Sequence, residues 1–297
     1  MGDRTIVITG STGGIGKETA RGLARLGARV VLVGRDPHRA AAAADELRRH
    51  TGNDAVDALT ADVTRQADLR RLADEVGARY GRLDVLVNNA AIVRDRRELT
   101  EDGVEAMFAA NVLAPFLLTH LLLPTLRAAG RARVVNVTGA VPRGRIDLDN
   151  LQGERRYPWF INQTKRALMA MSYEFATRLP GDEVTINVAY PGHAYTDMNR
   201  NLSAATFPAP ARPLVPLLRL VLPIAYGGRA IEKASRSSVR LASDPALSGV
   251  HRTYVDTNGR PTPWPRCAVD ARNREVIWAL CERLSGPLST NGTFVCP

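Results

Sequence analysis

Residues 9–16 read Thr-Gly-Ser-Thr-Gly-Gly-Ile-Gly, and the rest of the chain can be ordered around this stretch. An apolar run at 6–8 precedes it, and residues 17–24 have the spacing of a helix. Glycine adopts positive φ and lets the backbone approach a ligand closely, and unpaired amides at a helix start bind anions. The stretch therefore predicts a site for the pyrophosphate of a dinucleotide, although a glycine-rich turn alone is also compatible with an ordinary loop.

Composition indicates one α/β domain spanning residues 1–297. The chain is long enough, and at 45% hydrophobic residues apolar enough, to bury a large core, and no change in composition divides it. The net charge is +10, but acidic residues are interleaved with the basic ones. This pattern favours an anionic cofactor or a small-molecule substrate over nucleic acid.

Cysteine usage and hydropathy predict a cytoplasmic protein. The three cysteines, at 267, 281 and 296, lack metal-ligand spacing, so we expect no metal site and a reducing compartment. The first strand begins by about Thr5, which leaves no room for a leader ahead of it. Two apolar stretches, 113–126 and 214–225, contain proline and fall short of the roughly 20 residues that span a bilayer. We expect neither to cross a membrane.

Apolar, β-branched runs alternate with helical patterns along the chain. Strands are predicted at 28–33, 56–60, 83–87, 133–137, 185–189 and 252–255, and helices at 37–50, 64–80, 100–127, from after Tyr157 to 177, at 228–242 and up to 284. Such alternation predicts right-handed crossovers and a doubly wound parallel sheet of the Rossmann type. Ligands bind such sheets at the carboxyl ends of the strands.

The end of the second strand bears on the choice of cofactor. Dinucleotide folds carry an acidic residue there for the adenosine ribose, or a basic residue for a 2′-phosphate. Gly34 stands at the acidic position and Arg35 follows it, which favours NADP(H) over NAD(H), unless Arg35 is only a solvated loop residue. Asp62, next to Val63, could accept a hydrogen bond from adenine or cap a helix beginning near Thr64.

The whole pattern resembles the short-chain dehydrogenase/reductase family, and the retinol-dehydrogenase-like branch in particular. The matching residues are Thr9, Gly10, Gly14, Ile15 and Gly16, then Asp62, Val63, Asn88, Asn89, Ala90, Asn111, 134–137, Lys165, Pro191, Gly192 and Thr196. The resemblance covers nearly the whole chain. It implies a seven-stranded parallel sheet, a bound nicotinamide dinucleotide, and a homodimer or homotetramer built on the two long helices that hold Asn111 and Lys165.

The resemblance also implies where the cofactor and the substrate lie. The implied cofactor contacts are Gly10, Ser11, Thr12, Gly14, Ile15, Gly16, Arg35, Asp62, Val63, Asn89, Ala90, Lys165, Pro191, Gly192 and Thr196. The nicotinamide ribose and carboxamide are expected at Lys165 and Thr196. Residues 203–226 are expected to cover the substrate, and residues 249–297 form a C-terminal extension.

Two positions depart from the family pattern. The family has a proton-transferring Tyr four residues before the Lys, where this chain has Ile161, and no tyrosine in the chain has a lysine four residues later. The family's substrate-binding Ser falls on Gly139, beside Thr138. A positioned acid contributes about 10²–10⁴ in rate and an oxyanion donor about 10²–10³, so ordinary carbonyl reduction should be slower by several orders of magnitude.

Three functions remain open on these residues. The first is an atypical NADP(H)-dependent reductase of a bulky apolar molecule, whose candidate catalytic residues are Asn111, Lys165, Thr138, His193 and Tyr195. The second is a non-redox cyclase, isomerase or lyase that keeps the dinucleotide as part of its pocket. The third is a non-catalytic NADP(H)-binding protein.

Each candidate has a structural alternative. Asn111 could be a satisfied core or interface amide, His193 an exposed loop residue, and Tyr157 a structural residue held extended by Pro158. The apolar residues at 214–222 predict the bulky substrate, with core packing and membrane-surface contact as the alternatives.

Overall fold

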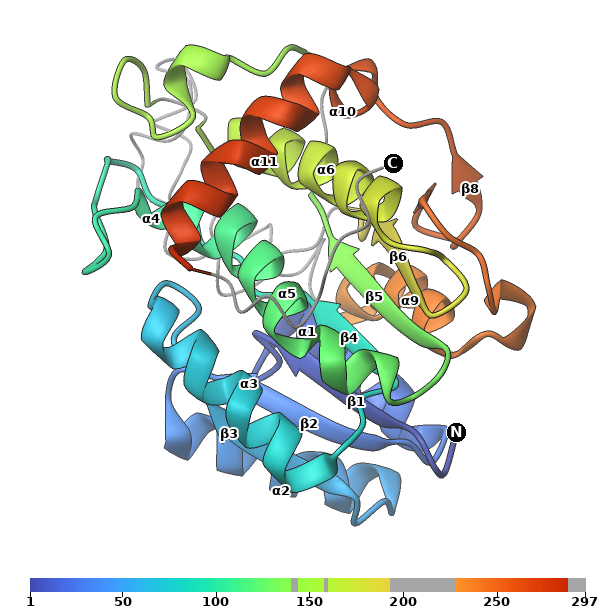
Figure 1. The fold of residues 1–297 in the computed structure, drawn as a ribbon. Coiled ribbons are helices and arrows are strands. Elements are labelled where there is room, and N and C mark those ends of the chain that lie inside the picture. The colour runs from blue at the N-terminus through green and yellow to red at the C-terminus, as the bar shows by residue number, and fades with distance from the viewer. Residues whose placement is uncertain (140–143, 158–159, 193–227, 288–297) are drawn as a thin grey trace.

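The structure is a computed structural model that describes residues 1–139, 144–157, 160–192 and 228–287. One eight-stranded sheet, in the order β3-β2-β1-β4-β5-β6-β7-β8, lies between two layers of helices (Figure 1). Strands β1 to β7 pair in parallel, and only β8 runs antiparallel to its neighbour. The predicted doubly wound Rossmann sheet is confirmed, with a short antiparallel strand added at one edge.

The predicted elements are present with small shifts at their ends. The strands are β1 (Thr5–Thr9), β2 (Arg29–Gly34), β3 (Val56–Thr60), β4 (Val85–Asn88), β5 (Ala132–Val137), β6 (Val184–Ala189), β7 (Thr253–Val255) and β8 (Pro261–Thr262). The helices are α1 (Gly14–Arg25), α2 (Pro37–Thr51), α3 (Gln66–Tyr80), α4 (Ala106–Phe108), α5 (Ala114–Arg127), α6 (Phe160–Arg178), α9 (Gly228–Ser243), α10 (Arg266–Val269) and α11 (Ala271–Ser285). Shorter elements are a π-helical turn, η1 (Ala109–Leu113), and the 3₁₀ turns η2 (Leu148–Asn150) and η5 (Pro245–Leu247).

Alternation along the strands divides the core into two layers. In β1, Ile6 and Ile8 pack with α1, α2 and α9, whereas Val7 packs with α3, α5, α6 and α11. All three side chains are fully buried. Strands covered on both faces read as continuous apolar runs, which is why the sequence located them correctly.

The long helix that was predicted to begin at residue 100 begins at Ala106. Glu105 caps it, because the Glu105 carboxylate accepts hydrogen bonds from the amides of Met107 and Phe108. Gly103, at φ +72°, lies in the preceding turn. The extra polar residues before Glu105 therefore form a turn and not helix.

The helical run Ala106–Arg127 is longer than the predicted apolar stretch 113–126, and its 22 residues are apolar enough to cross a membrane. Burial argues for a core helix instead, because 89% of its most apolar window is buried inside the fold. The second stretch, 214–225, lies outside the described residues.

Helix α11 lies across α6 and α5 (Figure 1). Trp278, which is almost fully buried, packs edge-on against Phe116 of α5 and Phe175 of α6, with ring centroids 4.9 Å and 5.2 Å away. Arg274 forms an ion pair of 2.6 Å with Glu174 on α6. The chain's own C-terminal helix thus covers part of the surface of α5 and α6.

Candidate functional site

The turn after β1 forms a cradle at the carboxyl edge of the sheet. Gly10 has a φ of +64°, and a Cβ there would lie 2.8 Å from Ala90 Cα. A Cβ on Gly16 would lie 2.4 Å from both Asn89 Nδ2 and the Gly10 carbonyl oxygen. The backbone can pass this closely only because these positions carry no side chain.

The start of α1 is open to an anion. The helix begins at Gly14, its N-cap is Gly13, and no side chain caps its first amides or places a carboxylate in its first turn. Uncapped amides and the positive end of the helix dipole stabilise a bound phosphate. The cradle and the uncapped helix start therefore fit the pyrophosphate of a dinucleotide.

Asn89 and Ala90, at the end of β4, hold this turn in place. Asn89 Nδ2 donates to the carbonyl oxygens of Thr9 (2.9 Å) and Gly10 (3.0 Å). The amides of Asn89 and Ala90 donate to Thr9 Oγ1. Val63, Thr9 and Ala90 line one pocket beside the turn. Asn89 and Ala90, both predicted as cofactor contacts, therefore fix the shape of the glycine turn.

Ser11, one of the predicted cofactor contacts, uses its hydroxyl within the protein. Ser11 Oγ donates to the Ile8 carbonyl (2.7 Å) and accepts from the Val33 amide (3.0 Å), so it ties the turn to β2. Thr12 is partly buried, and its Cγ2 would lie 2.4 Å from a Cβ on Gly34. Any side chain at 34 would have to displace Thr12.

The other residues at the end of β2 separate into two roles. Arg35 is exposed at this edge, whereas the Asp36 carboxylate caps α2 by accepting from the amides of His38 and Arg39. These backbone hydrogen bonds lower the pKa of Asp36. The Arg35 guanidinium is thus the charged group that remains for a ligand beside β2.

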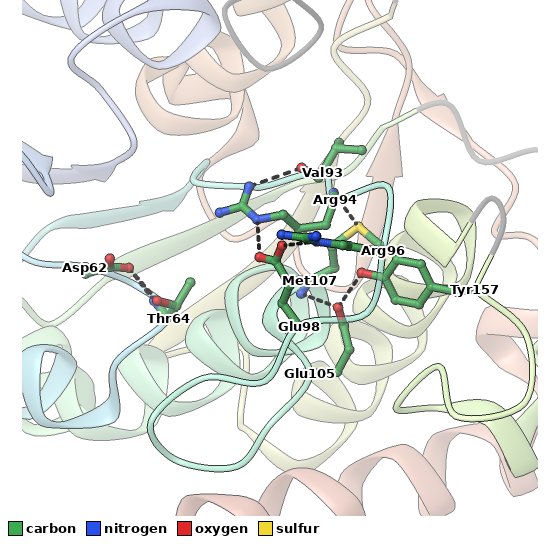
Figure 2. Close-up of polar contacts among 9 residues, drawn as sticks. All are labelled: Asp62, Thr64, Val93, Arg94, Arg96, Glu98, Glu105, Met107 and Tyr157. Atoms are coloured by element: carbon green, nitrogen blue, oxygen red, sulfur yellow. Dashed lines mark hydrogen bonds and ion pairs between the residues drawn. The ribbon is translucent and has the colours of Figure 1, made fainter. Parts of the chain in front are cut away.

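Asp62 closes a turn before α3 and does not cap the helix, contrary to the capping alternative. Its Oδ1 accepts from the Thr64 amide (2.9 Å) and the Thr64 hydroxyl (2.7 Å), and the helix begins two residues later, at Gln66 (Figure 2). Asp62 Oδ2 accepts no hydrogen bond among the described residues. The adenine contact predicted for this carboxylate stays a prediction.

Asn111 sits within the π-helical turn η1 and is almost fully buried. Its Oδ1 accepts from the Ile92 amide (2.9 Å), and its Nδ2 donates to the Ile92 carbonyl (3.1 Å) and to Thr164 Oγ1 (3.1 Å). Both amide hydrogens are therefore used. Asn111 links the segment after β4 to the residue before Lys165, which is a positioning role for its side chain.

Lys165 projects from α6 toward the end of β5. Its Nζ donates to the Val137 carbonyl at 3.3 Å, and only 6% of the residue is exposed. Burial lowers the pKa of Lys165 to about 8. Gly139 lies against its stem, where an added Cβ would lie 3.6 Å from Lys165 Cγ, an ordinary contact.

Thr138 and Ile161 complete the described part of the site. Thr138 is 3% exposed, and its Oγ1 has no hydrogen-bond partner among the described residues. A buried hydroxyl without a partner is costly, so it fits a site that a ligand completes. Ile161 is partly buried, and its carbonyl accepts from Thr164 Oγ1 (2.9 Å).

Within the described residues no tyrosine hydroxyl bonds to Lys165. Tyr157 lies before α6, in no helix or strand, and its hydroxyl donates to Glu105 Oε1 at 2.7 Å (Figure 2). Pro191 and Gly192 follow β6 as expected. His193, Tyr195 and Thr196, together with residues 203–226, lie outside the described residues.

The carboxylate of Glu105 was not singled out from the sequence. It is fully buried and accepts from the Tyr157 hydroxyl and from the amides of Met107 (2.9 Å) and Phe108 (2.6 Å). Burial raises the pKa of Glu105 although these hydrogen bonds oppose the shift. Glu is not one of the common N-cap residues, and the only signal in the sequence is that the helix dipole favours an acidic residue near a helix start.

A second carboxylate orders the segment after β4. Glu98 pairs with both Arg94 (3.2 Å) and Arg96 (3.1 Å), and the Arg94 amide donates to Met107 Sδ (3.3 Å), as Figure 2 shows. These contacts fasten residues 93–98 to the start of the long helix. The segment that carries Ile92, the partner of Asn111, is thereby held at both ends.

A doubly wound sheet with a glycine cradle and an uncapped helix at its carboxyl edge defines a dinucleotide-binding α/β protein. The family model of the short chain dehydrogenases matches residues 4–206, and the chain belongs to that family. The family consists of oxidoreductases that bind a nicotinamide dinucleotide and act on small molecules.

Several relatives match over most of their length. Human retinol dehydrogenase 13 is 34% identical over 289 residues, which cover 95% of this chain and 85% of the relative. Human dehydrogenase/reductase SDR family member 13 is 36% identical, with 95% and 73% covered. Among solved structures, an uncharacterized protein from Mycobacterium paratuberculosis has a TM-score of 0.72 at 30% identity, with 95% and 93% covered. The RhlG/NADP complex of Pseudomonas aeruginosa has a TM-score of 0.64 at 28% identity, with 86% and 95% covered.

Proposed function

We propose that this chain is an NADP(H)-dependent oxidoreductase that acts on a bulky apolar small molecule through an altered proton-transfer site. The proposal rests on one observation: the residues expected to bind the cofactor are in place, whereas the two positions expected to handle the proton carry no hydroxyl. The cradle of Gly10 and Gly16 and the buried Lys165 are in place, whereas positions 161 and 139 carry an isoleucine and a glycine.

The preference for NADP(H) rests on the end of β2. Gly34 leaves no carboxylate for the ribose, and a side chain at that position would collide with Thr12. The Asp36 carboxylate is engaged with the helix, while Arg35 is exposed and can pair with a 2′-phosphate. Among similar solved structures, the RhlG complex also holds NADP.

The proposed loss of both hydroxyls limits which substrates this protein can reduce. Loss of a positioned acid and of an oxyanion donor slows carbonyl reduction by several orders of magnitude unless another group replaces them. Reduction of an enone or a quinone places less demand on an acid at the oxygen. Ile161 makes the position apolar, and relatives of the chain are named retinol dehydrogenase and polyprenol dehydrogenase, so we expect a long apolar substrate.

A non-redox reaction, such as a cyclisation, isomerisation or elimination, is the second candidate. The substitution of both hydroxyl-bearing positions, 161 and 139, favours it, because such a reaction needs no proton at a reduced oxygen. In that case the dinucleotide would serve as a fixed part of the pocket. A protein that only binds NADP(H) is the third.

We also propose a cytoplasmic location without membrane contact, in keeping with the free, buried thiols of Cys267 and Cys281 and with the burial of the apolar run Ala106–Arg127. We also propose a homodimer or homotetramer, with α11 covering part of α5 and α6 in each subunit.

The proposal is tested first by binding. Calorimetry should give a lower Kd for NADPH than for NADH, and Gly16→Ala should abolish binding because its Cβ meets Asn89 Nδ2 and the Gly10 carbonyl. Gly77→Ala is the matched control, because the nearest atom to its Cβ, Thr125 Oγ1, is 3.7 Å away. Equal loss in both variants would contradict the cradle.

Turnover then separates the candidates. NADPH oxidation is followed optically with menadione, 2-cyclohexenone, all-trans-retinal and simple aldehydes. Oxidation with an enone or quinone supports the proposed reductase. Tight NADPH binding without oxidation of the cofactor by any of these compounds would reject it in favour of the non-redox or binding function.

A further inference from the structure

The ammonium of Lys165 has donors to spare. An ammonium carries three N–H donors, and the described residues provide one acceptor, the Val137 carbonyl at 3.3 Å. No carboxylate pairs with Lys165 among the described residues, in contrast with Lys17, which pairs with Glu46 at 3.0 Å. Two donors of this nearly buried cation therefore remain for bound molecules, one for the nicotinamide ribose expected at Lys165 and one for a substrate.

The elements around this ammonium supply little else that can carry a proton. On α6, Ile161 lies one turn before Lys165 and has no hydroxyl. On β5 and just after it, the neighbours are the Val137 carbonyl, the Thr138 hydroxyl and Gly139. From η1, Asn111 uses both its amide hydrogens elsewhere, and Arg143, His193 and Tyr195 lie outside the described residues.

We propose that Lys165 itself is the proton donor of this site, and that its ammonium hydrogen-bonds directly to a substrate oxygen on which negative charge develops. The proposal rests on the proposed function. The ligand class is a molecule with a conjugated carbonyl or quinone oxygen. When bound, the reduced dinucleotide supplies the hydride. As the electron pair settles on the substrate oxygen, an N–H bond of Lys165 breaks, an O–H bond forms, and the neutral amine regains its proton from water.

The burial of Lys165 suits this role. An ordinary lysine is a weak acid near neutral pH, whereas burial brings the pKa of Lys165 to about 8, and a general acid works best when its pKa lies near the working pH. Gly139 places no side chain beside the Lys165 stem, and the Thr138 hydroxyl, which has no hydrogen-bond partner among the described residues, precedes it in the chain. Lysine therefore replaces the missing hydroxyl instead of assisting it.

The composition of the chain makes a direct test practical, because Lys17, Lys165 and Lys233 are its only lysines. Protein labelled with ¹³C and ¹⁵N at the lysine ε-carbon and ζ-nitrogen should give three Cε–Nζ correlations, assigned by Lys→Arg substitution at 17 and 233. Titration from pH 6 to 11 should give a midpoint near 8 for Lys165. A Lys165 midpoint above 9 would overturn the proposal.

Kinetics with the best substrate of the panel supply the second test. At saturating NADPH, the wild-type kcat should fall about tenfold per pH unit above the midpoint of Lys165. Lys165→Arg should be slower and flat from pH 7 to 10, because guanidinium stays protonated. Lys165→Met should lose at least about 10²-fold in kcat, whereas Lys233→Met, an exposed control, should not change. A pH-independent wild type, or Lys165→Met within threefold of it, would overturn the proposal.

Failure of the two proposals can be told apart. If the wild-type protein binds NADPH and reduces a substrate while the Lys165 midpoint stays above 9, only the role of Lys165 fails. If no panel substrate is reduced, the proposed function fails, and the role of Lys165 in reduction fails with it. The Kd of Lys165→Met for NADPH shows how much of a loss in rate at fixed NADPH comes from weakened cofactor binding, and a rate that returns to the wild-type value when NADPH is raised to saturation would overturn the proton-donor role.

Discussion

Ile161→Tyr with Gly139→Ser, which adds the two hydroxyls whose loss we propose, should convert this chain into a conventional carbonyl reductase. Residue 161 lies four positions before Lys165 on α6, so both side chains leave the same face of the helix. In Ile161→Tyr, the new hydroxyl is expected to lie beside the ammonium. In Gly139→Ser, the new Cβ makes only ordinary contacts, at 3.6–3.9 Å from the Lys165 stem, so the substitution needs no rearrangement.

The size of the gain follows from the two groups. A positioned general acid is worth about 10²–10⁴ in rate, and an oxyanion donor about 10²–10³. Because the two act on one oxygen, their effects do not multiply fully. We expect the double variant to gain at least about 10²-fold in kcat/KM for simple ketones and aldehydes, measured by NADPH oxidation.

A matched control separates hydroxyls from shape. Ile161→Phe with Gly139→Ala adds the same ring and the same Cβ without either hydroxyl, so it should gain nothing. Circular dichroism shows whether both double variants are folded, and a binding assay shows whether both bind NADPH. If Ile161→Tyr with Gly139→Ser is folded, binds NADPH and is no faster than the Phe/Ala control, residues 161 and 139 do not occupy the positions assigned to them.

Three further substitutions test other parts of the structure. Arg35→Ala should raise the Kd for NADPH by about 10–100-fold and leave the Kd for NADH unchanged, because a charge-assisted hydrogen bond is worth about 1.5–3 kcal/mol. Calorimetry measures both Kd values, and an equal rise in the two would refute the role of Arg35. Tyr157→Phe should lower the free energy of unfolding by about 1–3 kcal/mol in urea, since the buried Glu105 carboxylate loses a donor, and an unchanged midpoint would contradict this. Burial lowers the pKa of His120 from 6.5 to about 4, so between these pH values the unfolded chain binds a proton that the folded chain does not. The free energy of unfolding should therefore fall by up to about 3 kcal/mol as the pH drops from 6.5 to 4, and it should fall less in His120→Phe. Equal pH dependence in both proteins would exclude His120 as the cause.

The sequence was sufficient where one local pattern determines one structure. The buried runs of β1 and β2, the glycine turn between 9 and 16, and the end of α3 at Tyr80 all lie where they were predicted. In each case neighbouring residues alone fix the outcome, through burial on both faces of a strand, positive φ, or a left-handed glycine such as Gly81 after the helix.

Contacts between residues far apart in the sequence could not be predicted. The Ser11 hydroxyl accepts from the Val33 amide, 22 positions away, and nothing in the local pattern indicates this. The long helix was started too early because Glu105 was not recognised as its cap, and the Tyr157 contact with Glu105 spans 52 positions. The role of Asn111 likewise depends on Thr164, 53 positions later. Such pairings depend on the tertiary fold, which periodicity does not encode.

The position of α11 has a consequence for synthesis of the chain on the ribosome. Gln66 of α3 donates to the Leu284 carbonyl, 218 positions later, and Trp278 covers the aromatic rings of Phe116 and Phe175. Until residues 271–285 emerge, the nascent chain exposes that aromatic surface. During translation the protein is therefore exposed to premature association through this face, and we expect chaperones to engage it there before the last helix docks.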